Sequence, residues 1–295
     1  MFIFIKKETY AIKRYENVIV NKNKKSNLLG FSYESNTIFK NINLTFKSGQ
    51  RYVLAGLNGC GKSTLLKIIG GKVICPHETI SVKGEDPFRK TICNNFITYI
   101  NNEWGMRTVA YCGYNMPLQS SITVKEMSKH VKRQYPERNK ELLHVLDINE
   151  DWRLNSISEG QRKRVQLYLN LIKPFDVCLL DEITVNLDIL VKDKLLQYLK
   201  KESTVNKSCI IYVTHIFDGL DDWFSDLIYI NKQGIINEVP DREIEERGSI
   251  YNFLLEKFKQ EEKISKNDWE QKSDKIILNN AGGYSDGVLI NYIPD

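Results

Sequence analysis

Short apolar runs that alternate with helical stretches dominate the pattern of this chain. Residues 52–55, 96–100, 175–180 and 209–214 are nearly uninterrupted apolar runs, which predict buried strands. Residues 38–46 end in an alternation of apolar and polar positions that is typical of a half-buried strand. Buried strands separated by helices predict an α/β fold.

A second pattern covers residues 121–155, where charged residues are dense and apolar residues fall at helical spacings. Pro136 divides this stretch into two predicted helices. Ser158, followed three residues later by Gln161, forms a capping box that predicts the start of another helix. We therefore expect a helical subdomain over about residues 115–172, inserted into the α/β core.

The two ends of the chain differ in composition from the region between them. Residues 1–26 are rich in lysine and arginine, and residues 241–295 are highly charged. We expect a basic arm and a charged C-terminal extension that flank one domain over residues 27–240. The arm fits a solvated segment, and contact with nucleic acid or an acidic partner is the alternative.

Composition limits the class of protein. Hydrophobic residues make up 42% of the 295 residues, which is enough for a sizeable core, and the mean hydropathy is −0.37. No apolar run approaches the roughly 18 residues that a membrane span needs. The six cysteines form no C-x-x-C pair, so zinc is not indicated, and we expect reduced thiols in a cytoplasmic protein.

One loop fits the phosphate-binding motif G-x-x-x-x-G-K-S/T. Its glycines let the backbone turn tightly and aim N–H groups at phosphate oxygens, and the helix that follows adds its dipole. The lysine can reach the β- and γ-phosphates, and the next hydroxyl can ligate Mg²⁺. A chance match in a surface turn is the alternative, but a predicted strand before the loop and a predicted helix after it favour a nucleotide site. The motif consists of Gly56, Leu57, Asn58, Gly59, Cys60, Gly61, Lys62, Ser63 and Thr64.

Acidic and imidazole side chains follow two other predicted strands. Asp181 and Glu182 end the run at 175–180, as a P-loop requires of its partner strand. Asp181 would hold Mg²⁺ through water, and Glu182 would orient or deprotonate the attacking water. His215 follows the run at 209–214, where a strand end faces the ligand crevice of an open sheet. A helix cap is the alternative for the acidic pair, and a structural role is the alternative for the histidine.

Two further positions leave alternatives open. Ser158 and Gly160 begin a helix whose N-terminus could bind an anion, although these residues alone favour an ordinary helix cap. Tyr33 lies 29 residues before Lys62 (62 − 33) and could stack on an adenine ring. Phe31 is a rival for that role, and packing against the core is the alternative for both.

The order and spacing of these motifs resemble the ATP-binding cassette (ABC) ATPase family over residues 27–240. Ser158 lies 23 residues before Asp181 (181 − 158), and His215 lies 34 residues after Asp181 (215 − 181). The resemblance implies a P-loop ABC nucleotide-binding domain with an antiparallel β subdomain, with ATP and Mg²⁺ as cofactors. The catalytic residues that it implies are Glu182, His215 and Lys62.

The resemblance also assigns positions outside the P-loop. Tyr33 would stack on the adenine, and His215 would contact the γ-phosphate. About 40 residues after Lys62 (102 − 62), where the family has a metal-contacting glutamine, this chain has Asn102, which puts that contact in question. The signature and D-loop positions that would contact nucleotide are Ser158, Glu159 where many members have glycine, Gly160, Gln161 and Asp188.

Three segments are similar to a narrower subgroup, the soluble ABC ATPases that lack membrane domains. They read YINNEW at 99–104, DEITVNLD at 181–188 and THIFDGL at 214–220. In plants these proteins form ABC subfamily I, and in yeast the subgroup includes an accessory protein of the CCR-NOT complex, which acts in transcription and mRNA deadenylation. The likeness implies a regulatory ATPase that docks on such a complex in the cytoplasm, and in the nucleus as well.

The resemblance further implies a dimer, because the family holds ATP between two domains arranged head to tail. A second copy or a related chain would supply the other half-site, and ATP would drive dimerisation. Two rival functions are an ATPase subunit of a transporter whose membrane subunit is a separate chain, and a binding module without hydrolysis. Asn102 argues against the first rival, and the pair Asp181 and Glu182 argues against the second.

Overall fold

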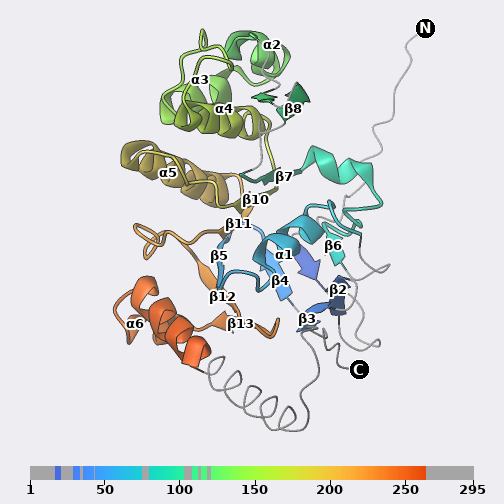
Figure 1. The fold of residues 1–295 in the computed structure, drawn as a ribbon, viewed down its shortest axis with the longest axis vertical. Coiled ribbons are helices and arrows are strands. Elements are labelled where there is room, and N and C mark those ends of the chain that lie inside the picture. Colours follow the sequence, from blue (N-terminus) through green and yellow to red (C-terminus); the bar gives the residue numbers. More distant parts are fainter. Residues whose placement is uncertain are drawn as a thin grey trace, which may run out of the picture.

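The computed structural model describes residues 17–20, 29–33, 36–42, 44–74, 80–102, 108–111, 114–117 and 121–263. Within these residues, a six-stranded sheet with the strand order β13-β12-β5-β11-β10-β7 forms the centre of the fold (Figure 1). Its strands are parallel except for β13, which is antiparallel to β12. The strands are β5 (Arg51–Gly56), β7 (Ile97–Ile100), β10 (Val177–Asp181), β11 (Cys209–Val213), β12 (Asp226–Ile230) and β13 (Ile236–Val239).

Helices cover both faces of this sheet, which explains the nearly continuous apolar runs in its parallel strands. Successive side chains of a strand point to opposite faces, so Val53 and Leu54 belong to two different cores. One core joins Leu54 to α1 (Lys62–Ile69). The other joins Val53 to α4 (Glu159–Leu171) and α5 (Ile189–Val205).

Two smaller antiparallel sheets are formed by the strands that precede β5 together with β6. One has the strand order β4-β1-β6, and the other is the pair β2-β3. The expected strand at 38–46 is therefore divided, because its two halves pair with different strands. Residues 17–20, within the expected arm, pair with two strands of the first of these sheets, and the β-branched residues at 18–20 favour a strand there. The strands are β1 (Asn17–Val20), β2 (Leu29–Tyr33), β3 (Asn36–Ile42), β4 (Leu44–Lys47) and β6 (Ile80–Val82).

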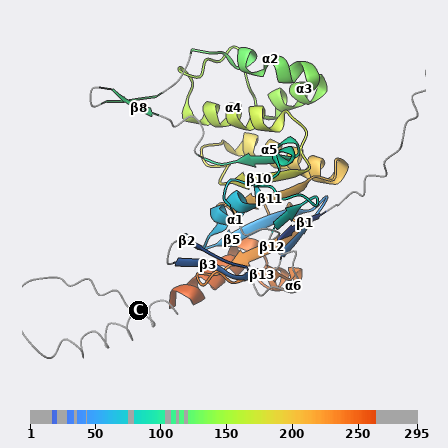
Figure 2. The same ribbon diagram turned by 90° about the vertical axis from the view of Figure 1, so that its right-hand side faces the viewer.

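The helical subdomain lies at one end of the molecule and consists of α2 (Val124–Gln134), α3 (Pro136–Val145) and α4 (Figure 1). Pro136 is the first residue of α3, where its missing N–H costs nothing. A capping box starts α4, as predicted, with Ser158 and Gln161 bonded reciprocally. A hairpin of β8 (Thr108–Tyr111) and β9 (Tyr114–Pro117) precedes the subdomain and extends away from it (Figure 2).

The C-terminal extension begins with helices that pack on the domain, at the end opposite the helical subdomain (Figure 1). These are α6 (Asp241–Glu245) and a helix over residues 250–263. Ile250, Phe253 and Leu254 are buried in the same core as Val53. This helix lies beyond the expected domain boundary at residue 240, and it packs on the domain because apolar residues spaced along the charged segment bury one of its faces. A 3₁₀ helix, η1 (Thr91–Asn95), precedes β7.

Candidate nucleotide-binding site

The P-loop joins β5 to α1 and presents backbone N–H groups rather than side chains. Gly59 and Gly61 have left-handed φ angles of 81° and 101°. A Cβ at Gly56 would lie 2.3 Å from the backbone oxygen of Ile230, so only glycine fits there. No side chain caps α1 at Gly61, and its first turn holds no acid. The positive end of the helix is therefore left for an anion.

Lys62 is buried and folds back over the loop. Its Nζ donates hydrogen bonds to the backbone oxygens of Gly56, at 2.8 Å, and Leu57, at 3.0 Å. Burial lowers the pKa of this ammonium, and the nearby Glu182 and Asp181 counteract that shift. The ammonium is thus held at the centre of the loop, where phosphate oxygens can replace the two carbonyls.

Two hydroxyl groups donate hydrogen bonds to one carboxylate beside the P-loop. The Ser63 hydroxyl donates to Asp181 Oδ1 at 3.0 Å, and the Tyr99 hydroxyl donates to Asp181 Oδ2 at 3.3 Å. Burial raises the pKa of Asp181, while these two hydrogen bonds lower it. A hydroxyl and a carboxylate at one point beside a phosphate site match the hard oxygen ligands that Mg²⁺ prefers. The residues present therefore fit the predicted metal.

A carboxylate and an imidazole meet at the ends of β10 and β11. His215 Nε2 lies 3.3 Å from Glu182 Oε1, and both side chains are a little over one-third exposed. Glu182 has a left-handed φ of 52°. Burial and the charge of Lys62 lower the pKa of His215, so the ring is neutral at pH 7. The pair can accept and hold a proton at the edge of the sheet.

Two cavities border these groups. The smaller, of about 190 Å³, is lined by Ser63, Lys67, Asn101, Asn102, Asp181 and Glu182. The larger, of about 710 Å³, reaches from the P-loop to the helix at 250–263, so the C-terminal extension forms part of the site wall. It is lined by Gly56, Leu57, Asn58, His215, Lys232, Leu255, Phe258, Lys259 and Glu262.

The predicted signature residues lie elsewhere. Ser158 and Glu159 are exposed at the start of α4, and none of the positions 158–161 lines either cavity. A Cβ at Gly160 would lie 2.8 Å from the backbone oxygen of Asn186, so α4 packs directly on the loop before α5. Asp188 caps α5 through the N–H of Val191 at 2.9 Å. The structure thus brings together the P-loop, acidic and histidine positions, and it leaves Ser158 and Glu159 exposed and apart from both cavities.

Several residues of the site were missed by sequence reasoning. Tyr99 contacts Asp181, and Lys67 lines the smaller cavity. Lys163 and Gln166 of α4 donate to the loop after β7 that carries Asn102. Nothing along the chain distinguishes Lys163 from a solvated lysine, because it lies between Arg162 and Arg164. The side chain of Tyr33 lies outside the described part of the structure, so adenine stacking stays a prediction.

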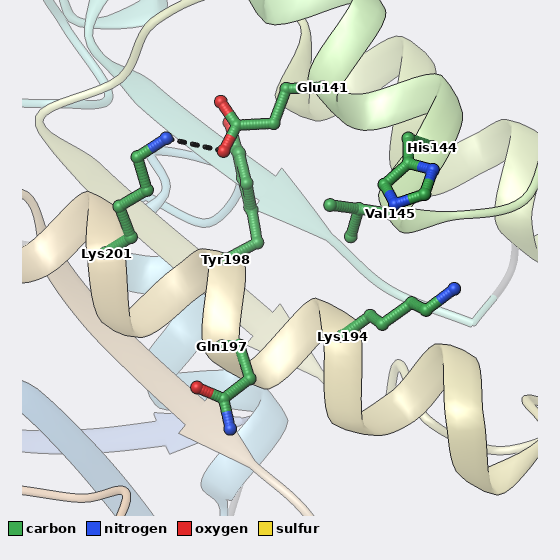
Figure 3. A pocket seen from close by; sticks show the side chains of 7 residues that line it. All are labelled: Glu141, His144, Val145, Lys194, Gln197, Tyr198 and Lys201. Carbon is green, nitrogen blue, oxygen red and sulfur yellow. Dashed lines mark hydrogen bonds and ion pairs between the residues drawn. The ribbon is translucent and has the colours of Figure 1, made fainter.

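A further cavity, of about 270 Å³, lies between α3 and α5 (Figure 3). An ion pair between Lys201 and Glu141 spans it at 2.6 Å. His144, Lys194 and Tyr198 also line it, and none of these residues belongs to a predicted motif. This cavity is a junction between the helical subdomain and the core rather than part of the nucleotide site.

A parallel sheet with a P-loop after one strand, an acidic pair after a second and a histidine after a third defines a P-loop nucleotide-binding protein. A family model described as "ABC transporter" matches residues 39–185. The chain belongs to the ATP-binding cassette family of ATPases, as predicted. No helix among the described residues is long and apolar enough to cross a membrane.

Curated relatives support the narrower likeness. The chain is 42% identical to ABC transporter I family member 20 of Arabidopsis thaliana over 198 residues, which cover 66% of this chain and 60% of that protein. It is 40% identical to family member 21 over 68% of this chain and 72% of that protein. It is 34% identical to CCR4-associated factor 16 of Saccharomyces cerevisiae over 71% of this chain and 75% of that protein. The chain thus spans well under the full length of these relatives.

Solved structures share the fold. An ATP-binding subunit of an ABC transporter matches with a TM-score of 0.64 and 19% identity, over 82% of this chain and 98% of that one. A dimeric ATP-binding cassette bound to ADP and Pi matches with a TM-score of 0.58 and 20% identity, over 75% and 97%. The predicted fold class is therefore confirmed.

Proposed function

We propose that this chain is a non-transporter ABC ATPase that hydrolyses ATP between two ABC domains and so acts as an ATP-driven dimerisation switch. The observation that carries the proposal is the separation of two half-sites within one chain. The P-loop, Glu182 and His215 gather at one edge of the sheet, whereas Ser158 stands exposed at the start of α4 in the helical subdomain. A second domain, most simply another copy, would complete each site.

The P-loop would hold the phosphates of ATP. Its N–H groups and the start of α1 attract the charge, and Lys62 would exchange its two carbonyl acceptors for phosphate oxygens. Ser63 and Asp181 would hold Mg²⁺, which neutralises phosphate charge when it is bound. The residues of the loop would therefore bring the γ-phosphate toward Glu182.

Glu182 would act as the general base. Its carboxylate would orient a water and take a proton from it as the water oxygen bonds to the γ-phosphorus. The bond from that phosphorus to the bridging oxygen then breaks, and ADP and phosphate result. Neutral His215, at 3.3 Å, would hold the carboxylate and contact the γ-phosphate.

The signature positions would act on the nucleotide of the partner domain. Ser158 and Gln161 keep the first turn of α4 in order, and Gly160 lets this turn pack against the backbone of Asn186. Asp188 sits between α4 and α5, where Arg164 of α4 donates to its carboxylate. ATP would thus join two copies head to tail, and hydrolysis would release them.

We further propose that the switch acts on a CCR-NOT-type complex in the cytoplasm or nucleus. This rests on the 34% identity to a yeast protein named as a CCR4-associated factor. Co-elution of the Glu182→Gln protein and ATP with purified CCR-NOT subunits would support it. The second candidate is an ATPase subunit of a transporter, favoured by 32% identity to the polysialic acid transport ATP-binding protein KpsT of Escherichia coli, over 67% of this chain and 83% of that protein. Co-purification with one detergent-solubilised membrane protein, and not with those subunits, would favour that candidate.

Light scattering tests the switch itself. Glu182→Gln protein with ATP and Mg²⁺ is expected to shift from the mass of a monomer to that of a dimer. The double variant Lys62→Ala, Glu182→Gln is the control, because it lacks the ammonium that holds the phosphates. A monomer with bound ATP in the single variant would overturn dimerisation by a second copy and point to another chain as the partner.

A further inference from the structure

Lys163 connects the signature helix to the nucleotide cavity. It lies one turn after Gly160 in α4 and is only 6% exposed. Its Nζ donates to the backbone oxygen of Asn101 at 3.0 Å and to Asn102 Oδ1 at 3.2 Å. Gln166, on the same side of α4, donates to the Asn101 oxygen at 2.8 Å. Hydrogen bonds from two side chains of one helix therefore fix the loop after β7.

A buried ammonium is costly unless its donors are satisfied. Among the described residues, no carboxylate lies within ion-pair distance of Nζ, so the oxygens of Asn101 and Asn102 compensate for the burial of this ammonium. Lysine has donors only, which means that the amide of Asn102 must turn its oxygen toward Lys163. The orientation of this amide thus follows from chemistry rather than from the similar shapes of its two ends.

The other end of the amide is left for the cavity. Asn102 lines the space of about 190 Å³ that also contains Ser63, Asp181 and Glu182. With Oδ1 committed to a cation, a second cation at the same oxygen would be repelled. The Nδ2 group carries two hydrogens and can donate only to an acceptor, such as a phosphate oxygen or a water.

We propose that Lys163 is a positioning residue that makes Asn102 a hydrogen-bond donor in the nucleotide cavity and keeps its oxygen from serving as a metal ligand. This rests on the proposed function, because the cavity must hold the phosphates of ATP. Asn102 therefore performs a different task from the glutamine that the family resemblance places there. Movement of α4 against the core would also move this donor, since both are joined through Lys163.

Substitutions at Asn102 distinguish a role as hydrogen-bond donor from a role as metal ligand. Asn102→Ala removes both ends of the amide, and Asn102→Asp replaces the donor with a strong metal ligand that can still pair with Lys163. A donor role predicts that both variants lower kcat by about tenfold, the scale of one hydrogen bond to a charged group. For Asn102→Ala, it also predicts that the factor by which Mg²⁺ tightens binding of a fluorescent ATP analogue stays unchanged. Wild-type kcat in the Asp variant, or loss of the Mg²⁺ factor in the Ala variant, would overturn the proposal.

Substitutions at Lys163 test the positioning. Lys163→Met is expected to lower kcat as much as Asn102→Ala, and the double variant is expected to be no slower than either single one. Lys163→Arg keeps the donors and should recover most of the rate. Lys173→Met is the matched control, because Lys173 donates to Asn95 Oδ1 at the same 3.2 Å but on the exposed surface. Independent losses that multiply in the double variant would contradict a shared role.

Failure of the inference can be told from failure of the proposed function. Lys62→Ala measured in the same binding assay should lose the ATP analogue. If Lys62→Ala loses the analogue, and Asn102→Ala keeps the wild-type kcat and the wild-type affinity for the analogue, only the proposed role of Lys163 is wrong. If Lys62→Ala binds normally, the cavity does not hold phosphates and both proposals fall.

Discussion

His215 Nε2 and Glu182 Oε1 lie 3.3 Å apart at the ends of two neighbouring parallel strands, β11 and β10. The pairing of these strands fixes the distance, because Asp181, the residue before Glu182, is in register with Val213. The N–H of Glu182 also donates to the Val213 oxygen at 2.9 Å. A carboxylate and an imidazole are thus held together by the sheet rather than by a flexible loop.

Replacing the carboxylate should separate binding from hydrolysis. Glu182→Gln keeps the shape of the side chain but cannot accept the proton of the water, so phosphate release should fall by about 10²- to 10⁴-fold. Binding of a fluorescent ATP analogue should change little. Glu137→Gln, at an 88% exposed carboxylate of α3, serves as the control and should keep the wild-type rate. Wild-type phosphate release from Glu182→Gln would rule out this residue as the base.

The lowered pKa of His215 should appear in the pH dependence of stability. Its ordinary value is 6.5, and burial followed by the charge of Lys62 lowers it in the folded chain. The unfolded chain therefore binds more protons just below pH 6.5, and the free energy of unfolding should fall as the pH falls. The fall should end below the folded-state pKa, where both states are protonated.

Denaturant titration at several pH values measures this effect. The unfolding free energy of the wild type minus that of His215→Gln should decrease as the pH is lowered from 7 through 6.5. Asp181 has a raised pKa and contributes in the opposite sense above its ordinary 3.8, but it is common to both proteins and cancels in the difference. A difference that is flat with pH would mean that His215 titrates normally.

Gly160 should be needed for the contact between α4 and the loop before α5. An added Cβ would lie 2.8 Å from the Asn186 oxygen, a backbone atom that cannot simply rotate away. Gly160→Ala should therefore destabilise the fold by about 1–3 kcal/mol in denaturant unfolding, despite the better helix propensity of alanine. It should also weaken the ATP-dependent dimer while one chain still binds the ATP analogue. Unchanged stability would show that α4 can shift without cost.

The helix at 250–263 should contribute to the stability of the whole domain. Phe253 is fully buried, so Phe253→Ala should lower the unfolding free energy by about 3–5 kcal/mol. Tyr251 lies on the opposite, solvent side of the same helix and is 55% exposed. Tyr251→Ala should cost less than about 1 kcal/mol. Equal effects of the two substitutions would mean that this helix does not pack on the core.

The central sheet and the principal motifs could be predicted from sequence because their signals are local. Apolar runs mark the parallel strands, Pro136 marks the start of α3, and the Ser158 capping box marks α4. The short strand at 17–20 was missed because four residues inside a basic segment give little periodicity. The packing of the helix at 250–263 was not predicted, because the many charged residues of this segment obscure the apolar residues on its one buried face.

Residues that act through tertiary contacts could not be predicted in the same way. Lys163 looks in sequence like any solvated lysine between two arginines, and its burial depends on where the loop after β7 lies. Tyr99 is an ordinary strand residue until β7 and β10 are seen to be neighbours. A pattern along the chain indicates which side of an element is buried but not which atom lies opposite.

The left-handed backbone of Glu182 explains how two consecutive carboxylates line one cavity. In a regular strand Asp181 and Glu182 would point to opposite faces, but the φ of 52° ends the alternation. That conformation is strained for any residue with a Cβ and relaxed for glycine. At this position the proposed chemistry and the backbone thus favour different residues: a glycine would ease the local strain, but it would lack the carboxylate that the proposed hydrolysis requires.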